Sequence, residues 1–393
     1  MNDHFDIVIA GGGIVGSMSA YVLGRREPGL RIAVIEADPT YRLASTPKAT
    51  GIVRHQFGVP ENIRMCVASS TFFDAAPELL AVGDEKADIG WAERGYVWLV
   101  PPELVATVES LRQIQIANGA AVDLLDPATL KSRWPQFAVE ALGGGFAGAR
   151  GAGWLDPWAL LQAVKRKAIS QGTSYITDRV TRLNRSGRRI VTVTTASGRT
   201  LSCGHVVNAA GALGAATIAA LADVPLRIEP RKRCVFVVAT REDVRGLPMT
   251  VHVESGVWFR PEGMGLICGV APKPGNDPAT DDLTVDDALF QEIIWPTMAE
   301  IAPVFESLRI ASTYACLYDF NPLDENAILG PPPDLDNFMI ATGFSGHGVM
   351  QSPATGCAIA ELILDGRFTT IDLTRFGYER VLRGEALPEP ACF

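Results

Sequence analysis

The sequence predicts an α/β protein in which a domain of parallel strands and helices is interleaved with an α+β domain built on an antiparallel sheet. Three observations predict this arrangement. The first 36 residues alternate strand, glycine turn, helix and strand, two later apolar runs at 205–209 and 338–341 each enter a turn of small residues, and strand-like runs between them are separated by turn residues. At 393 residues the chain is also long enough for two interleaved domains.

Composition and charge exclude several classes of protein. Hydrophobic residues make up 47% of the chain and charged residues 20%, so the chain should fold. The net charge of -9 argues against a nucleic-acid or anionic-membrane partner, because both need a basic face. The sequence has no run of 18 apolar residues, and its first strand begins by Phe5, so we expect no transmembrane segment, no signal peptide and a cytoplasmic location.

The cysteines predict neither a zinc site nor a disulfide framework. Their number is odd, and no pair has the C-x-x-C spacing, so we expect no metal and a reducing compartment. The seven are Cys66, Cys203, Cys234, Cys268, Cys316, Cys357 and Cys392.

The N-terminal elements follow one another as a dinucleotide-binding unit requires. Phe5–Ala10 is an apolar run rich in β-branched residues, which predicts a strand. Gly11–Gly16 supplies a turn, and Ser17–Gly24 reads as a helix. A second apolar run, Ile32–Ile35, predicts the next parallel strand and ends at Glu36.

The glycines and the glutamate of this unit each have a structural role in binding a dinucleotide. Gly11 permits the tight turn, Gly13 lets the backbone approach a pyrophosphate, and Gly16 lets the helix pack closely on the sheet. Glu36 stands where a carboxylate accepts the hydrogen bonds of a ribose diol and would repel a 2'-phosphate. The pattern therefore favours FAD or NAD over NADP.

Two further patterns are interpreted as structural. Gly143–Gly148 also satisfies G-x-G-x-x-G, but Val139–Leu142 before it is too short for a central strand. The glycines of Gly143–Gly153 indicate a mobile loop rather than the start of a helix. The basic run Arg231–Arg233 is interpreted as the solvated edge of a strand rather than as a site.

The later segments complete the predicted fold. His205–Ala209 reads as a buried strand that enters the small-residue turn Ala210–Gly214, and Phe338–Ala341 reads as another that enters Gly343–Gly348. After this loop, Ser352–Pro353 predicts the N-cap and first residue of a helix that stops near residue 366. The strand-like runs that suit an antiparallel sheet are Val235–Thr240, Val257–Arg260 and Gly265–Val270.

Three of these segments together resemble the D-amino-acid-oxidase-like superfamily of FAD-dependent oxidoreductases: Gly11–Glu36, Val206–Gly211 and Gly343–Gly348. The resemblance implies a Rossmann-like FAD-binding domain interleaved with an antiparallel-sheet substrate domain. The FAD-binding domain is expected to comprise residues 1–85, 150–225 and 325–380, the substrate domain residues 86–149 and 226–324, and a C-terminal tail residues 381–393.

Other segments indicate a branch of that superfamily. Gly51–Phe57 followed by Pro60–Arg64 looks like the sarcosine oxidase and dimethylglycine dehydrogenase branch. Tyr318–Asn321 through Gly330, with the ending 366–373, is similar to the FAD-dependent mitochondrial complex I assembly factor of that branch.

The resemblance implies FAD as the cofactor, bound without a covalent link. Cys316, followed by Tyr318, resembles the Cys-x-Tyr segment that carries covalent flavin in monomeric sarcosine oxidase, and a buried free cysteine is the favoured alternative. The residues expected to contact the cofactor are Gly11, Gly13, Ile14, Val15, Gly16, Glu36, Ala37, Ser45, Thr46, Gly51, Val180, Ala210, Gly211, Gly343, Gly346, His347, Gly348, Val349 and Met350.

Four residues are expected to carry the chemistry. Arg54 occupies the position that grips the substrate carboxylate in sarcosine-oxidase-like enzymes, and the alternative is an arginine paired with Glu61 near the surface. His347 lies in the loop expected beside the flavin, although a lone histidine is often structural. Tyr318 and Trp258 are candidates for an aromatic substrate wall, and core packing would explain either of them as well.

Two departures from the family pattern bear on the substrate and the electron acceptor. Met350 stands where a second, lysine ligand for the carboxylate is expected, which argues against sarcosine itself. Ile267 stands where oxidases of this branch place a lysine that promotes reaction with oxygen. This favours a dehydrogenase that passes electrons to a quinone or an electron-transfer flavoprotein over an oxidase that uses oxygen.

The expected function is oxidation of the C–N bond of a small secondary or tertiary amine, or of an N-substituted amino acid, by hydride transfer to flavin N5. The flavin supplies the redox chemistry and the protein positions the reactants. Two alternatives stay open: a flavin oxidoreductase acting on a 2-hydroxy acid or an opine-type compound, and a flavin-bearing assembly or scaffold protein.

Overall fold

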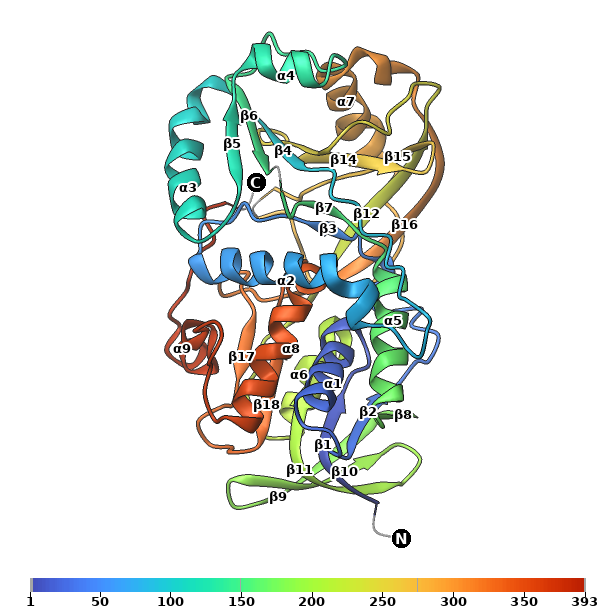
Figure 1. Ribbon diagram of the computed structural model, residues 1–393, viewed down its shortest axis with the longest axis vertical. Coiled ribbons are helices and arrows are strands. Elements are labelled where there is room, and N and C mark those ends of the chain that lie inside the picture. The colour runs from blue at the N-terminus through green and yellow to red at the C-terminus, as the bar shows by residue number, and fades with distance from the viewer. Residues whose placement is uncertain (1–2, 149, 274, 392–393) are drawn as a thin grey trace.

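The computed structural model describes residues 3–148, 150–273 and 275–391, so Cys392 lies outside the described residues. Two large sheets follow one another along the long axis of the molecule, and the long helix α2 (Pro60–Leu79) crosses between them (Figure 1). The chain starts at one end of the molecule, and its C-terminal segment returns to the middle, close to where α2 crosses (Figure 1).

The sheet nearer the N-terminus is open and mostly parallel. Its eight strands have the order β17-β18-β11-β1-β2-β8, with β10 and β9 branching from β11. β17 and the β9–β10 hairpin are antiparallel to their neighbours. The strands are β1 (Asp3–Ala10), β2 (Ile32–Glu36), β8 (Ser174–Thr177), β9 (Val180–Ser186), β10 (Arg189–Thr195), β11 (Thr200–Asn208), β17 (Ile328–Gly330) and β18 (Phe338–Thr342).

Both faces of this sheet are covered, which explains why its central strand is an uninterrupted apolar run. Ile7 and Ile9 of β1 point into the core shared with α1, α5 and α8, whereas Val8 and Ala10 point into the core shared with α6. The covering helices are α1 (Ile14–Arg26), α5 (Pro157–Ser170), α6 (Gly211–Ala220) and α8 (Gly348–Leu364).

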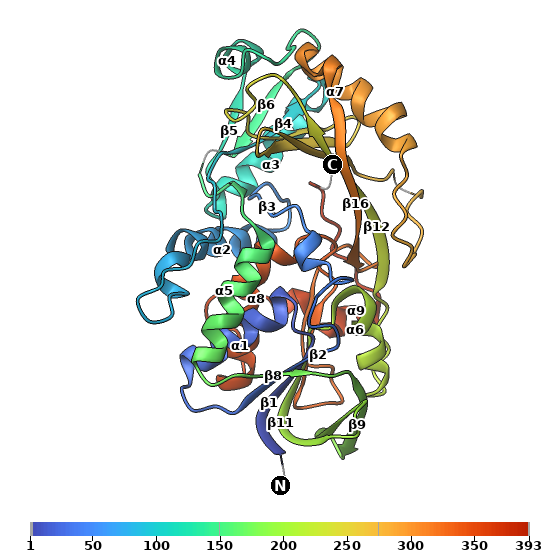
Figure 2. The same ribbon diagram turned by 90° about the vertical axis from the view of Figure 1, so that its right-hand side faces the viewer.

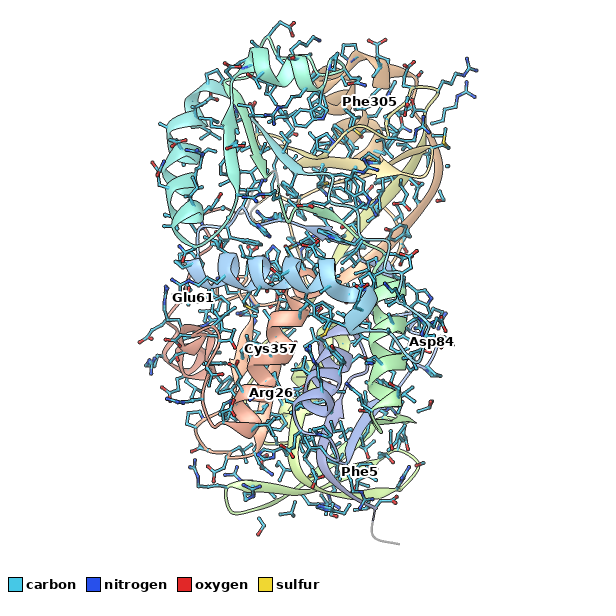
Figure 3. All side chains as sticks on the ribbon, in the orientation of Figure 1. Phe5, Arg26, Glu61, Asp84, Phe305 and Cys357 are labelled. Carbon is cyan, nitrogen blue, oxygen red and sulfur yellow. The ribbon has the colours of Figure 1, made fainter. Side chains whose placement is uncertain are left out.

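The second sheet is antiparallel except where β4 pairs with β13. Its strand order is β16-β12-β15-β14-β13-β4-β6-β5. The strands are β4 (Tyr96–Val100), β5 (Val122–Leu125), β6 (Gly144–Gly148), β12 (Glu229–Ala239), β13 (Met249–His252), β14 (Val257–Glu262), β15 (Gly265–Val270) and β16 (Arg309–Phe320). One face packs on its own aromatic core, which includes Phe305; Figure 3 labels this residue at the opposite end of the molecule from Phe5.

Smaller elements surround and connect the sheets. The long strands β12 and β16 run side by side along one flank of the molecule towards the parallel sheet (Figure 2). The remaining elements are the helices α3 (Val105–Ala117), α4 (Pro127–Arg133), α7 (Trp295–Ile301) and α9 (Tyr378–Arg383), and the paired strands β3 (Ile52–Val53) and β7 (Gly153–Trp154).

The strands of each sheet come from one of the two sets of residues that the sequence assigned to separate domains. We therefore propose the same division, with residues 1–85, 150–225 and 325–380 in the first domain and 86–149 and 226–324 in the second. Within the described part of the chain, no helix is both long enough and apolar enough to cross a bilayer.

The prediction of a mobile loop across Gly143–Gly153 is wrong for Gly144–Gly148. These residues form β6, a buried strand between β4 and β5. A Cβ atom on Gly144 would lie 2.7 Å from the Leu125 carbonyl oxygen, and one on Gly145 would lie 2.4 Å from the Leu130 side chain. Close packing therefore explains these glycines, and the segment does not open a helix.

The predicted start of the last long helix at Pro353 is also wrong, because α8 begins at Gly348 and contains Pro353. Proline has no N–H to donate to the carbonyl of Val349. The hydroxyl of Ser352 donates to that carbonyl instead, over 2.9 Å. This replacement lets the helix continue through a residue that usually marks its first turn.

Candidate active site

The glycine turn after β1 has the geometry that a dinucleotide requires. Gly11 has a φ of +104°, and a Cβ atom there would lie 2.3 Å from the carbonyl oxygen of Ala209. A Cβ atom on Gly16 would lie 2.0 Å from the Gly11 carbonyl oxygen, so this glycine allows α1 to start against the turn. Both positions exclude any other residue.

The opposite side of the turn is open and faces polar groups. A Cβ atom on Gly13 would meet only the hydroxyl of Thr46, at 3.4 Å. That hydroxyl accepts a hydrogen bond from the Ile14 amide at the start of α1, over 3.1 Å. Open space at the N-terminus of a helix is suited to a pyrophosphate.

The Glu36 carboxylate, at the end of β2, is oriented by two backbone amides. Its Oε2 accepts the Gly12 amide over 2.8 Å, and its Oε1 accepts the Asp38 amide over 2.9 Å. Each carboxylate oxygen keeps a further lone pair, so two ribose hydroxyls can still donate to the group. This donor and acceptor set, together with the open turn, fits the adenosine diphosphate part of FAD.

The other residues expected near this part of the cofactor lie at the ends of neighbouring elements. Ala37 follows β2, Val180 begins β9, and Gly211 begins α6 directly after Ala210. The small-residue turn predicted across Ala210–Gly214 is therefore shorter than expected, because α6 takes over at its second residue. Ser45 donates its hydroxyl to the Leu317 carbonyl over 2.6 Å, so this side chain ties its own loop to β16.

A cavity of about 730 Å³ lies at the ends of β12 and β16 and the start of α8. It gathers most of the remaining residues that were expected to contact the cofactor or the substrate, although they come from distant parts of the chain; Gly343 and Gly348 are not among its described lining residues. Those lining it are Gly51, Arg54, Trp258, Cys316, Tyr318, Gly346, His347, Val349 and Met350.

The loop that carries His347 is fixed by the carboxylate of Asp319 on β16. Oδ2 of Asp319 accepts the amides of Gly343 over 2.9 Å and Phe344 over 3.1 Å. Burial raises the pKa of Asp319 to about 6, although these amides oppose the shift. Gly346 has a φ of +98°, and a Cβ atom there would lie 2.4 Å from the Tyr318 ring. Only glycine therefore fits this turn.

His347 is neutral at physiological pH. Burial, and then the nearby charge of Arg54, lower the pKa of His347 to about 3. The ring packs edge-on against Phe57 with 5.0 Å between ring centres, and it borders the cavity. A neutral imidazole placed there can donate one hydrogen bond and accept another.

Arg54 is a buried cation at the cavity wall, with 8% of its surface exposed. Its Nη1 donates to the carbonyls of Gln56 and Ala391, and its guanidinium lies 4.1 Å from the centre of the Phe57 ring. Among the described residues, no carboxylate forms a salt bridge with it. The alternative pairing with Glu61 is wrong, because Glu61 pairs with Arg375.

The aromatic and thiol candidates also border the cavity. Burial raises the pKa of Tyr318 to about 12 and that of Cys316 to about 11, so both are protonated at neutral pH. Trp258 lies on β14 against Gly269 of β15, where it forms part of the cavity wall. The cysteines within the described residues are free thiols.

The interpretation of Arg231–Arg233 as a solvated edge is wrong for its two arginines. Arg231 and Arg233 are two residues apart on β12, so they share a face, and both line the cavity. Each pairs with Asp277, and Arg233 lies 4.6 Å from the centre of the Tyr318 ring. Their spacing along a strand was the available signal, but the partner Asp277 could not be read from the sequence.

The two positions that depart from the family pattern lie in different surroundings. Met350, in the first turn of α8, is buried and borders the cavity. Ile267 is paired with Arg260 across β14 and β15 and is not among the described cavity-lining residues. Arg260 itself donates from Nε and Nη2 to the Thr50 carbonyl, over 3.1 and 2.9 Å, and so fixes the loop beside Gly51.

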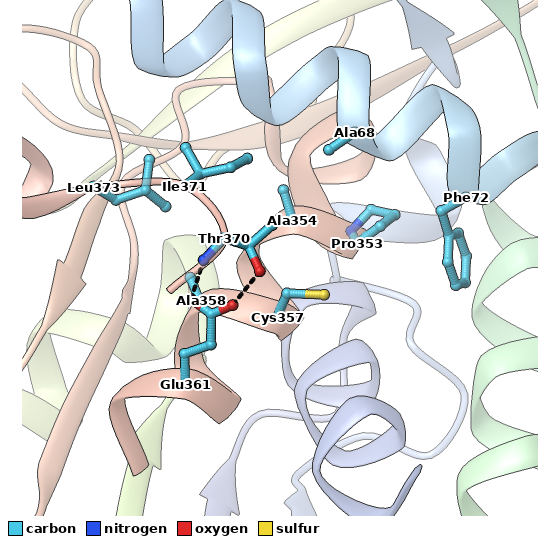
Figure 4. A pocket seen from close by; sticks show the side chains of 10 residues that line it. All are labelled: Ala68, Phe72, Pro353, Ala354, Cys357, Ala358, Glu361, Thr370, Ile371 and Leu373. Atoms are coloured by element: carbon cyan, nitrogen blue, oxygen red, sulfur yellow. Dashed lines mark hydrogen bonds between the residues drawn. The ribbon is translucent and has the colours of Figure 1, made fainter. Parts of the chain in front are cut away.

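A second, much smaller pocket of about 80 Å³ lies between α2 and α8 (Figure 4). Its lining is mainly apolar, with Phe72 on one side and Leu373 on the other. Glu361 at its edge accepts hydrogen bonds from Thr370, which fasten the segment after α8 (Figure 4). None of the residues expected to contact the cofactor or the substrate is among the described residues that line it, so the larger cavity is the candidate site.

Comparison with known proteins agrees with this geometry. A model of the family described as FAD dependent oxidoreductase matches residues 6–362. FAD-dependent oxidoreductase domain-containing protein 1 of Xenopus laevis is 35% identical over 422 residues, which cover 98% of this chain and 84% of the relative. Monomeric sarcosine oxidase of Bacillus sp. (strain B-0618) is 24% identical over 405 residues, which cover 98% of this chain and 99% of that relative.

Solved structures show the same fold. The crystal structure of L-proline dehydrogenase from P. horikoshii matches with a TM-score of 0.88 and 28% sequence identity, covering 98% of this chain and 100% of the other. The resemblance and the fold class predicted from the sequence are therefore confirmed.

Proposed function

The chain belongs to the FAD-dependent oxidoreductase family, and from that premise we propose that it oxidises the C–N bond of a small secondary or tertiary amine or N-substituted amino acid. The observation that carries this proposal is Arg54, a buried guanidinium at the wall of the large cavity without a described carboxylate partner. A buried cation without a counter-ion is costly unless a ligand supplies the opposite charge. A substrate carboxylate would supply it.

Bound FAD supplies the ring that accepts a hydride from the substrate carbon. The chain's own groups position the reactants. Arg54 binds the carboxylate through its planar fork. Tyr318 and Trp258 border the same cavity, where their rings exclude water and confine the substrate.

The loop before α8 and the start of that helix would stabilise negative charge in the cavity electrostatically. His347 is neutral and can exchange hydrogen bonds without adding a charge. The first amides of α8, from Gly348 onwards, lie at the positive end of a 17-residue helix that starts beside the cavity. With FAD bound beside it, this helix end would stabilise negative charge on the reduced flavin.

The electron acceptor is proposed to be a quinone or an electron-transfer flavoprotein rather than oxygen. The position at which related oxidases are expected to have lysine is Ile267, and this side chain supplies no cation. The 28% identity to a dehydrogenase of proline supports the same choice. We propose non-covalent FAD, because Cys316 is a buried thiol whose raised pKa disfavours the reactive thiolate.

The test is anaerobic bleaching of the flavin in the purified, FAD-loaded protein. We expect N-alkyl amino acids to bleach it, and 2-hydroxy acids of the same size to leave it oxidised. The reduced protein should then reoxidise slowly in air and rapidly with a quinone or an artificial dye. Bleaching by hydroxy acids alone would favour the hydroxy-acid alternative, and no bleaching by any compound would favour a scaffold protein.

A further inference from the structure

The C-terminal segment after α9 is fastened to the middle of the molecule. Its Leu387 amide donates to Oδ2 of Asp324 over 2.9 Å, and the Leu387 carbonyl accepts from the side chain of Asn326. The chain then continues to Ala391, which is fully buried. These contacts give the segment 385–391 a defined path to the start of α2.

Glu389 caps α2 from a distant part of the sequence. Its carboxylate accepts the amides of Gly58 and Val59, the latter over 3.1 Å, and the side-chain amide of Asn62 over 3.0 Å. The residue before α2, Val59, has no side chain that can cap the helix. A carboxylate at the N-terminus of a helix satisfies unpaired amides and interacts favourably with the helix dipole.

The segment also packs tightly on the chain just before α2. A Cβ atom on Gly58 would lie 2.2 Å from the ring of Pro390, so the close approach requires glycine at this position. Gly58 lies four residues after Arg54, so this contact fixes the chain close to the guanidinium.

The end of the described segment contacts Arg54. The Ala391 carbonyl accepts from Nη1 of Arg54 over 3.3 Å, and the Gln56 carbonyl accepts from the same nitrogen. Both acceptors are neutral, so they fix one corner of the guanidinium without cancelling its charge. The described hydrogen bonds of Arg54 leave its Nε and Nη2 for a ligand in the cavity.

We propose that Glu389 is a positioning residue for substrate binding: it caps α2 and thereby holds Ala391 against Arg54, so that the C-terminal segment orients the guanidinium that lines the cavity. This inference rests on the proposed role of Arg54. It gives the C-terminal segment a part in binding the substrate carboxylate, although the segment is 337 residues from Arg54 in the sequence.

The test uses the full-length, FAD-loaded protein and acetate as a minimal carboxylate probe, titrated by the change in flavin absorption, with acetamide as the uncharged control. We expect Glu389→Ala to weaken acetate binding about tenfold, as the loss of one ordering contact predicts. Glu389→Gln keeps one acceptor oxygen and should lose less. Glu385→Ala is the matched control, because Glu385 lies in the same segment but is exposed and pairs with Arg383, and it should bind acetate normally.

A second measurement does not depend on binding or turnover. Hydrogen exchange at the Gly58 and Val59 amides should accelerate in Glu389→Ala and stay unchanged in Glu385→Ala, because these amides donate to Glu389. If Glu389→Ala does not fold, Gly58→Ala displaces Pro390 instead and should weaken acetate binding similarly.

The outcomes separate this inference from the proposed function. If Arg54→Met leaves acetate binding unchanged, the carboxylate-binding role of Arg54 is wrong. If Arg54→Met weakens binding but neither Glu389→Ala nor Gly58→Ala does, only the positioning role of Glu389 is wrong.

Discussion

The two ends of the proposed cofactor and substrate region are built in opposite ways. At the dinucleotide end, Gly11–Gly16 and Glu36 lie within one short stretch, and backbone amides and missing side chains provide the binding geometry. At the substrate end, Arg54 contacts a carbonyl 337 residues away and shares its cavity with His347 and Tyr318. The first site is a local property of the chain, whereas the second exists only after both sheets have assembled.

This difference predicts different responses to substitution. A local site made of backbone groups loses its ligand when a side chain occupies the ligand's space, because the backbone there cannot shift to make room. An assembled site made of side chains should lose affinity in steps, since each contributor can be removed separately.

The dinucleotide end should show the largest effect. Gly13→Glu places a carboxylate on the open side of the turn, where a pyrophosphate would approach. We expect the purified variant to be colourless, with a circular dichroism spectrum like that of the yellow wild type. Gly246→Glu is the matched control, because Gly246 has open space around it, and this variant should retain the flavin. Retention of FAD by Gly13→Glu would contradict the local description of the site.

The substrate end should show a large but partial effect. Arg54→Met removes a charge-assisted contact worth roughly 2 to 5 kcal/mol when one partner is deleted. The substrate concentration that half-reduces the flavin should therefore rise by about 30-fold or more. Arg64→Met, at an exposed position of α2, is the control and should leave that concentration unchanged. An unchanged concentration in Arg54→Met would show that this end is not organised around a carboxylate.

A smaller effect is expected at Asp319, which fastens the His347 loop to β16. Burial raises the pKa of Asp319 to about 6, so the folded protein binds its proton more tightly than the unfolded chain does. Its contribution to stability is therefore present below about pH 4 and lost as the pH rises through about 6.

Between pH 5 and pH 7 the wild type should therefore lose about 1 to 2 kcal/mol of stability that Asp319→Asn does not lose. The measurement is the free energy of unfolding by urea at each pH. Asp243→Asn is the control, because the pKa of Asp243 is lowered to about 2 and its charge is constant above pH 5. Equal pH slopes for wild type and Asp319→Asn would show that this carboxylate does not titrate as described.

The smallest expected effect is at Cys316. Acid precipitation of the wild type should release the flavin into the supernatant, and Cys316→Ala should behave identically. Burial protects this thiol as a packed side chain with a raised pKa. Flavin that stays with precipitated wild type and leaves with Cys316→Ala would show a covalent link at the substrate end.

Sequence reasoning succeeded where the determinants are contiguous. The strand, turn and helix around Gly11 and the strands β14 and β15 follow from period and turn residues, and the structure confirms them. It failed where packing overrides local preference, as at β6, whose glycines make room for Leu130 and the Leu125 carbonyl rather than a mobile loop. It also failed at Pro353, because the Ser352 hydroxyl compensates for the missing amide.

The sequence by itself determined the dinucleotide turn, the family and the presence of Arg54 and His347. Only the tertiary structure decided that Arg54 is buried without Glu61, that Arg231 and Arg233 face the cavity, and that Glu389 caps α2. The physical reason is that glycine conformation and strand period are properties of neighbouring residues. Burial of a charge and the identity of its partner depend on contacts between residues hundreds of positions apart, which exist only in the folded chain.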